Sequence, residues 1–381
     1  MTEQSAGTGD PPLVFLVSHL HPTMGMERAA LELARNLSAC RAVSIVSLAD
    51  DHHDYDGLQL TVLDRRRIGW RRVLSLPALL RYRRTADPGA VYVTVGLWAS
   101  IPWLLVASEL ARRTLVWEHS LTRERVDATW SLRVLHALAA ILFPRAAAVV
   151  CVSDALAGDV KRVSPRIRTS TIDNGFPVVD EATLDERVRA RSPHGTRLLA
   201  AGSLTAVKNQ QLALRVLAEL PRSFTLDIAG DGPFRARLDV LARELQLGDR
   251  VRFLGRLEPS AMAALYRDAD VLVHTSLGET FGFVYFEAAD TALPVVSLDH
   301  RVARAFIPAL VPGTLSGDQP TDLAARVLEL SAAPPSRDVQ LAARARRAAA
   351  LDPLRIRATW LDQIEQVTGS PSTPLAAERA P

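Results

Sequence analysis

Short apolar runs alternate with amphipathic stretches along the whole chain. In the first half the runs extend from Leu13–Ser18 to Ala147–Val152, and in the second half from Leu199–Gly202 to Pro294–Leu298. Stretches with helical periodicity, such as Gln210–Leu220, lie between them. Strands and helices that alternate at this spacing are typical of parallel sheets covered on both faces. The pattern predicts two such α/β units in tandem.

The boundary between the two units is predicted near residues 175–195. Asn174-Gly175 is a turn signal after a strand-like run, and the polar segment that follows leads to a new strand at Arg197. Two parallel-sheet domains imply a cleft between them, because open sheets bind ligands beyond the carboxyl ends of their strands. The expected organisation is a first domain over residues 1–180, a second over 181–352, a last helix near Leu354–Val367 and a disordered tail over 369–381.

Composition narrows the classes of function. Of the 45 basic residues only Lys161 and Lys208 are lysines, and the formal net charge is +3. A nucleic-acid binder carries a concentrated basic excess, so we expect no nucleic-acid partner. The N-terminus has no apolar signal core, and no apolar run reaches the roughly 20 residues of a membrane helix. We therefore expect a cytoplasmic protein.

The most informative stretch is Ser276–Leu298, where a strand ends, a glycine-containing loop follows and a helix begins near Phe283. This arrangement places Glu279 in the loop and Glu287 in the second helical turn. A helix N-terminus accepts phosphate through its backbone N–H groups. The two carboxylates then flank that phosphate and accept hydrogen bonds from sugar hydroxyls. The alternative is that both are solvated acids at a helix start.

Two further loops follow strands of the same half. The sequence AGSLTAVKN, residues 201–209, places Lys208 at the mouth of the same cleft. Lysine suits phosphate as a compact point charge, and the alternative is a surface lysine beside a turn. The sequence IAGDGPFRARL, residues 228–238, lacks the G-x-G-x-x-G dinucleotide pattern. Its Gly230 and Gly232 are predicted to let a flat base approach the backbone.

Together with VRFLGRL, LYRDADVLVHTS, ETFGFVYFEA and LPVVSLD, these segments resemble the C-terminal domain of retaining glycosyltransferases of the GT-B fold, glycosyltransferase family 4. The resemblance is strong over residues 197–300. The first half resembles the family's acceptor-side domain more loosely, through HLHPTMGMERAALELARNL, WEHS and AVVCVSDAL with IDNGFP. The resemblance implies two tandem Rossmann-like, doubly wound parallel-sheet domains facing a cleft. It also implies that the last helix, about residues 353–368, crosses back onto the first domain.

The resemblance assigns roles residue by residue. Glu279 contacts the donor sugar hydroxyls, Glu287 binds the nucleotide ribose, and Lys208 binds the diphosphate. His119 lies by the reacting sugar carbon, so the implied catalytic set is His119, Glu279 and Lys208; a neutral core histidine is the alternative. The other implied donor-binding positions are Gly25 near the phosphates, the base-reading segment of Leu254, Gly255 and Arg256, and the backbone of Phe281, Gly282, Phe283 and Val284.

Ser203 departs from the family's pattern, in which many members carry an arginine at this position. The departure removes one cationic contact to the donor phosphates, and Arg28 and Arg256 are the candidates to replace it. The implied mechanism needs no metal. The nucleoside diphosphate leaves, Lys208 and the helix N-terminus stabilise its growing charge, and the acceptor hydroxyl attacks from the same face. Configuration is then retained.

The sequence thus predicts a glycosyltransferase that moves a sugar from a nucleotide-diphosphate sugar, with UDP-sugars favoured. The acceptor is a hydroxyl of a secondary metabolite, a polysaccharide or a lipid-linked intermediate, and no cofactor is expected. Two alternatives remain. One is a nucleotide-sugar epimerase of the same fold, and the other is a catalytically silent sugar-nucleotide-binding subunit.

Three polar stretches suggest other chemistry. Residues 268–270 spell a D-x-D metal signature but precede a buried strand, so a structural role is expected. Residues 50–54 carry consecutive rather than face-matched ligands, which favours a solvated loop over a metal site. Arg65–Arg84 is basic with interleaved aromatic residues. It is either an ordinary surface helix or a peripheral contact with the inner face of an anionic membrane.

Overall fold

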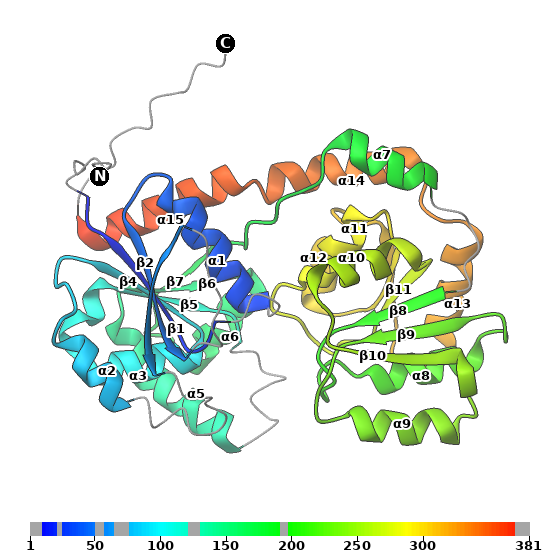
Figure 1. The fold of residues 1–381 in the computed structure, drawn as a ribbon, viewed down its shortest axis with the longest axis horizontal. Helices are drawn as coiled ribbons and strands as arrows, with labels where there is room; N and C mark the ends of the chain where they lie inside the picture. Colours follow the sequence, from blue (N-terminus) through cyan, green and yellow to red (C-terminus); the bar gives the residue numbers. More distant parts are fainter. Residues whose placement is uncertain are drawn as a thin grey trace, which may run out of the picture. The chain divides into compact units, whose positions relative to one another are not determined.

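The computed structural model describes residues 10–20, 25–49, 57–64, 76–120, 130–190 and 197–369. The chain forms two compact units (Figure 1). The first unit comprises Met1–Gly175 with Pro353–Pro381, and the second comprises Phe176–Asp352. Each unit is a parallel β-sheet with helices packed on it. Two Rossmann-like domains are therefore present, as the alternation of strands and helices predicts.

The sheet of the first unit has the strand order β3-β2-β1-β4-β5-β6-β7, with every pairing parallel. Every residue of β1, β4 and β5 is buried, because strands covered on both faces need no polar side. The strands are β1 (Leu13–Val17), β2 (Val43–Ala49), β3 (Gln59–Asp64), β4 (Val91–Val95), β5 (Thr114–Glu118), β6 (Ala148–Cys151) and β7 (Thr169–Thr171). The helices are α1 (Gly25–Ser38), α2 (Leu76–Arg83), α3 (Leu97–Val106), η2 (Ser108–Arg113), α5 (Trp130–Leu142), η3 (Phe143–Arg145), α6 (Asp154–Val163) and α15 (Pro353–Thr368).

The sheet of the second unit has the order β10-β9-β8-β11-β12-β13, again all parallel. Its strands are β8 (Arg197–Ala201), β9 (Thr225–Ala229), β10 (Val251–Gly255), β11 (Val271–His274), β12 (Val295–Leu298) and β13 (Gly313–Ser316). Its helices are α7 (Glu181–Ala190), α8 (Gln210–Glu219), α9 (Arg235–Glu244), η4 (Gly248–Arg250), α10 (Pro259–Asp268), α11 (Phe283–Asp290), α12 (Arg301–Phe306), α13 (Pro320–Ala332) and α14 (Arg337–Ala350). In both sheets the strand order reverses beside the first strand, which places ligand sites at the carboxyl ends of the central strands.

Two elements of the second unit differ from the hydrophobic pattern. The segment predicted as a polar linker contains α7, in which Leu184 is fully buried and Asp185 forms an ion pair with Arg337 of α14. β13 has the sequence GTLS and pairs with β12, although its single leucine gives no apolar run. Gly313 allows this pairing, because a Cβ there would lie 2.2 Å from the Val295 carbonyl oxygen. Tertiary contacts, rather than local periodicity, fix both elements.

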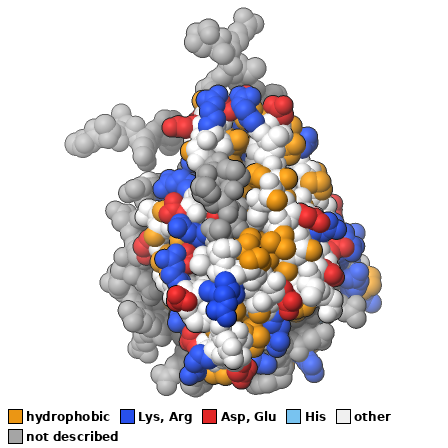
Figure 2. Space-filling model, turned by 90° about the vertical axis from the view of Figure 1, so that its right-hand side faces the viewer, with side chains coloured by type: hydrophobic (Ala, Val, Ile, Leu, Met, Phe, Trp, Pro, Cys, Tyr) orange, Lys and Arg blue, Asp and Glu red, His pale blue; other side chains and the backbone are white. Residues whose placement is uncertain are grey.

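Charged side chains of both signs are interspersed over the described part of the face in Figure 2. Within the described ranges, no helix is both long and apolar enough to cross a bilayer. Of the basic stretch Arg65–Arg84, residues 65–75 lie outside the described residues. The remainder forms α2, where Leu79 is buried and Arg83 forms an ion pair with Glu109. Residues 50–54 also lie outside the described residues.

Candidate functional site

The loops that follow β8 and β11 meet at the carboxyl edge of the second sheet. The Leu277 N–H donates to the Val207 carbonyl at 2.8 Å, and the Thr275 hydroxyl donates to the Lys208 carbonyl at 3.2 Å. β8 and β11 are neighbours in the sheet, so the two loops leave it side by side. These contacts bring Lys208 and Glu279 together, although 71 residues separate them in the chain.

Glu279 is the centre of a small charged cluster. Its Oε1 atom accepts hydrogen bonds from Lys208 Nζ and from His274 Nε2, the latter at 2.8 Å. The side chains are mostly buried, with 9% of Glu279, 19% of Lys208 and 3% of His274 exposed. The sequence predicts Glu279 and Lys208 in one site, and the structure places them in direct contact. Their donor-binding roles stay predictions.

The protonation states in this cluster follow from burial and charge. Burial alone would raise the pKa of Glu279, but the Lys208 charge and the His274 hydrogen bond outweigh it and hold that pKa well below its usual range. Burial lowers the pKa of His274 despite the neighbouring carboxylate. We therefore assign a charged Glu279 and a neutral His274 that donates its Nε2–H to the carboxylate.

The start of α11 lies directly after this loop. Gly282 precedes the helix with φ of +80°, a left-handed conformation that glycine adopts at little cost. A Cβ at this position would lie 2.8 Å from the Tyr285 ring and 3.6 Å from Glu279 Cγ. The first N–H groups of a helix, here those of Phe283 and Val284, have no partner within the helix. The helix start therefore presents donors beside Glu279.

Aromatic packing fixes the backbone at this point. The Phe281 side chain is 2% exposed. The centroid of its ring lies 5.0 Å from that of Phe283, 5.1 Å from that of Phe286 and 5.7 Å from that of Phe306. The predicted donor contact at residues 281–284 is a backbone contact, and the structure is compatible with it because the Phe281 ring packs in the core.

Glu287 lies in the second turn of α11, as predicted, and is half-buried. Tyr266 on α10 donates its hydroxyl hydrogen to Glu287 Oε2 at 2.8 Å. The loop after β10 carries the other proposed nucleotide contacts. Gly255 there has φ of +69° and open space where a side chain would be, and its carbonyl accepts the Gly230 N–H at 2.7 Å. Leu254 is half-buried.

The structure gives Gly230 and Gly232 a different role from the one predicted. A Cβ on Gly230 would lie 2.0 Å from the Gly202 carbonyl oxygen, and one on Gly232 would lie 2.5 Å from the Leu204 carbonyl oxygen. The space beside these glycines is therefore filled by the chain itself. They let the loops after β8 and β9 pack together, so the prediction that a base approaches there was wrong.

Ser203, the position at which many family members carry an arginine, is exposed. The Ser203 carbonyl accepts the Gln210 Nε2–H at 3.1 Å, and this bond holds the loop against α8. Of the two candidate replacements, Arg256 is exposed and has no ion pair among the residues that the structure describes. Arg28 is on α1 of the first unit, where its Nε donates to Glu32 at 3.0 Å. The replacement of the missing arginine by either residue stays a prediction.

The first unit holds the remaining predicted residues. Gly25 begins α1. His119 follows β5 and is 7% exposed, with its ring 4.5 Å from that of Trp117. Its Nε2 atom is buried without a hydrogen-bond partner among the described residues, and burial lowers its pKa to about 3. A buried polar atom without a hydrogen bond lowers the stability of the fold. We therefore expect a ligand or a water molecule to bind the His119 Nε2 atom.

Three residues of interest were not predicted from the sequence. Glu118 accepts the N–H groups of His119 at 3.0 Å and Ser120 at 2.6 Å, which fixes the loop that carries His119. His274, described above, ends a buried strand and reads as core in the sequence. Asn174, at the carboxyl end of β7, is 2% exposed, and both polar atoms of its side chain are buried without a partner among the described residues. The sequence offered it only as a turn signal.

The D-x-D segment, residues 268–270, has structural contacts at the amino edge of the second sheet, opposite to the edge that carries Lys208 and Glu279. Asp270 precedes β11, and its Oδ2 accepts the Arg197 N–H at 2.9 Å, which ties β11 to the start of β8. Within the described ranges, no three His, Cys, Asp or Glu side chains are grouped in a way that suits a metal ion.

Acidification is expected to destabilise the fold through its buried histidines. The pKa of His119 is about 3 in the folded state and about 6.5 when unfolded, so the unfolded chain binds the extra proton between these values. The free energy of unfolding therefore contains the full contribution of the neutral His119 above pH 6.5. It falls as the pH drops toward 3, by up to about 1.4 kcal/mol per pH unit. Urea midpoints at pH 7.5, 6 and 5 should decline less steeply for His119→Gln than for the wild type. Parallel declines would contradict the assignment.

Comparison with known proteins matches both halves of the chain to glycosyltransferases. A family model described as "Glycosyl transferases group 1" matches residues 185–349, and one described as "Glycosyltransferase Family 4" matches residues 23–179. An alpha-monoglucosyldiacylglycerol synthase of Streptococcus pneumoniae is 31% identical over 36% of this chain and 32% of its own length. A D-inositol 3-phosphate glycosyltransferase of Corynebacterium jeikeium is 33% identical over 33% of each chain. The chain thus aligns with about a third of the length of these relatives.

Solved structures share the whole fold. The Anabaena protein Alr3699/HepE, in complex with UDP and glucose, superposes with a TM-score of 0.73 at 22% identity, covering 93% of this chain and 99% of that one. Sucrose-phosphate synthase from Thermosynechococcus elongatus has a TM-score of 0.76 at 19% identity, covering 94% and 99%. At these identities the likeness establishes the fold.

Proposed function

The chain belongs to the group 1 and family 4 glycosyltransferases of the GT-B fold, and from this premise we propose that it transfers a sugar from a nucleoside-diphosphate sugar to an acceptor hydroxyl, with retention of configuration. The observation that carries the proposal is the cluster of Lys208, Glu279 and His274 beside the start of α11. It joins a cation, a carboxylate and a helix N-terminus, which are the groups that a sugar diphosphate requires.

The donor in this proposal lies across the carboxyl edge of the second sheet. Its diphosphate contacts Lys208 and the N–H groups at the start of α11, and its ribose hydroxyls bind Glu287. The sugar hydroxyls bind Glu279. We favour UDP as the nucleotide, and the complexes of the Anabaena protein with UDP and glucose support that choice. The open space at Gly255 supports a base beside that backbone.

The transfer breaks the bond between the anomeric carbon and the diphosphate oxygen. Positive charge develops on the sugar while negative charge develops on the leaving diphosphate, where Lys208 and the helix N-terminus stabilise it. The acceptor oxygen bonds to the anomeric carbon on the face that the diphosphate leaves, and its proton passes to the leaving phosphate oxygen. We propose that no metal takes part, because Lys208 and the helix N-terminus supply the positive charge.

His119 is proposed as a hydrogen-bonding residue for the donor sugar. Its neutral state and its buried, unpartnered Nε2 support this role, since a ligand hydroxyl would satisfy that nitrogen. For the acceptor, the names of two relatives point to a diacylglycerol and to an inositol phosphate. Acceptor choice resides in loops rather than in the fold, so the proposal extends to a hydroxyl on a lipid, a glycan or another small molecule.

A thermal-shift screen with UDP-, GDP-, ADP- and TDP-sugars tests the proposed donor. A ligand at 100 times its Kd stabilises the folded state by about 2.7 kcal/mol, so the matching donor should raise the melting temperature by several degrees. UDP-sugars are expected to give the largest shift, and free glucose, as the control ligand, should give none. If none of the four nucleotide sugars shifts the melting temperature, the proposal fails.

A further inference from the structure

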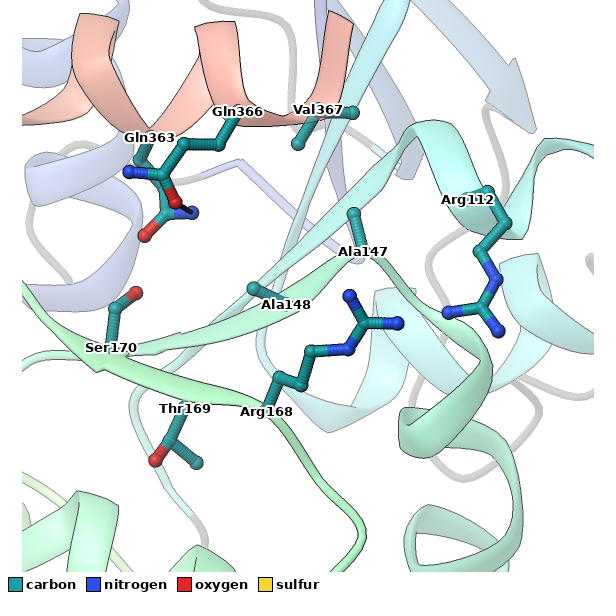
Figure 3. Close-up of a pocket in the computed structure, with 9 residues that line it drawn as sticks. All are labelled: Arg112, Ala147, Ala148, Arg168, Thr169, Ser170, Gln363, Gln366 and Val367. Carbon is teal, nitrogen blue, oxygen red and sulfur yellow. Dashed lines mark hydrogen bonds between the residues drawn. The ribbon is translucent and has the colours of Figure 1, made fainter. Parts of the chain in front are cut away.

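A polar cavity lies in the first unit, at the amino ends of β6 and β7 (Figure 3). This edge of the sheet is opposite to the one that carries His119 and Asn174, since all strands are parallel. The cavity has a volume of about 370 Å³. A water molecule occupies about 30 Å³ of liquid, so the space is large enough for a small organic ligand.

Two exposed arginines line this cavity. Arg112 lies in the last turn of η2 and Arg168 directly precedes β7. Neither guanidinium group has a hydrogen bond or ion pair with any residue that the structure describes, and no acidic side chain is among the lining residues. By contrast, Arg83 forms an ion pair with Glu109 in the same unit. The positive charge of the cavity is thus uncompensated by the residues around it.

The facing wall supplies hydrogen-bonding groups. Gln363 and Gln366 extend from α15 toward the strands, while Arg168 and Ser170 extend from β7 toward α15 (Figure 3). Arg168 and Ser170 share a face because side chains alternate along a strand. The Ser170 hydroxyl is buried without a partner among the described residues, which is costly for a polar atom unless a ligand or water satisfies it.

The room for a ligand comes from small side chains. In the parallel register Val149 pairs with Thr169, so Ala148 lies beside Arg168 on the same face. Both Ala147 and Ala148 line the cavity. The last turn of α15 adds only about half a negative charge, which is less than the charge of two guanidinium groups. The cavity therefore favours an anion.

We propose that this cavity binds a small phosphate ester of a polyol or sugar. The phosphate lies between Arg112 and Arg168, since guanidinium groups pair with phosphate oxygens through two hydrogen bonds. The polyol hydroxyls bind the Gln363 and Gln366 amides and the Ser170 hydroxyl. Because this ligand would touch both α15 and the sheet, its binding should stabilise the packing of α15 on the first unit.

Calorimetric titration of glycerol 3-phosphate into the full chain at low ionic strength tests the proposal. Wild-type protein is expected to bind it, and Arg112→Gln and Arg168→Gln should each weaken binding about tenfold, with the double variant about 100-fold weaker. The double variant Arg145→Gln/Arg166→Gln is the matched control. It removes two exposed arginines of the same unit that do not line the cavity, and it should bind as the wild type does.

Two further ligands test whether the bound phosphate belongs to a small ester, to free phosphate or to a lipid headgroup. Inorganic phosphate should bind more weakly than the ester, and vesicles that contain phosphatidic acid should not compete. Unchanged affinity in the Arg112→Gln/Arg168→Gln variant would place the ligand elsewhere and overturn the proposal. Absence of binding to the wild type, or binding of the vesicles alone, would overturn it too, the latter in favour of a lipid headgroup.

Discussion

Replacing Lys208 with methionine is expected to lower the rate of sugar transfer by about 100- to 1000-fold. Lys208 is a side-chain cation beside the start of α11, and the proposed mechanism assigns it to the leaving diphosphate, whose negative charge grows in the transition state. Methionine keeps much of the length and the apolar stem but removes the charge. The measurement is kcat with a donor from the screen, and a wild-type rate would contradict the assignment.

The same substitution should also destabilise the second unit. Glu279 would then lie buried without the cation that lowers its pKa, and removal of one partner from a buried ion pair costs about 3–5 kcal/mol. The variant Lys208→Met/Glu279→Gln should recover most of this stability while remaining inactive. Lys161→Met serves as the control, because it removes the other lysine, which is exposed on α6 of the first unit.

Glu279→Gln is expected to separate nucleotide binding from transfer. The carboxylate is proposed to contact the donor sugar, where positive charge develops, so its neutralisation should lower kcat by about 100-fold. The variant also releases Lys208 from its ion pair, which leaves the cation available to the diphosphate. UDP affinity should therefore stay unchanged or become tighter. Parallel losses of kcat and UDP affinity would show that Glu279 only maintains the local structure.

Much of the fold follows from local pattern. The strands β1, β4 and β11 are mostly apolar and buried throughout because both of their faces are covered, and their burial matches the prediction. α7 and β13 did not follow from the pattern. Their stability comes from partners distant in sequence, namely α14 for α7 and β12 for β13. Single-residue periodicity carries no information about such partners.

The candidate site, like the fold, could be predicted only in part from the sequence. The glycine before α11 and the strand before the loop placed Glu279 and Glu287 correctly on loop and helix. The ion pair of Glu279 with Lys208 depends on the adjacency of β8 and β11, which the sequence does not specify. His274 reads as a core residue until its contact with Glu279 is seen. Likewise, Gly230 was read as a ligand contact because a sequence cannot show that another loop fills the space.

Calorimetric titration of UDP into wild-type protein and Glu287→Ala is the most direct test of the proposed donor site. The wild type should bind one UDP, and the variant should bind at least about 100-fold more weakly, because two hydrogen bonds from the ribose to a carboxylate are lost. Tyr266→Phe is the matched control. It removes the hydroxyl that donates to Glu287 but keeps the carboxylate, so UDP affinity should change less than tenfold. Equal UDP affinity in wild type and Glu287→Ala would contradict the placement of the nucleotide at α11.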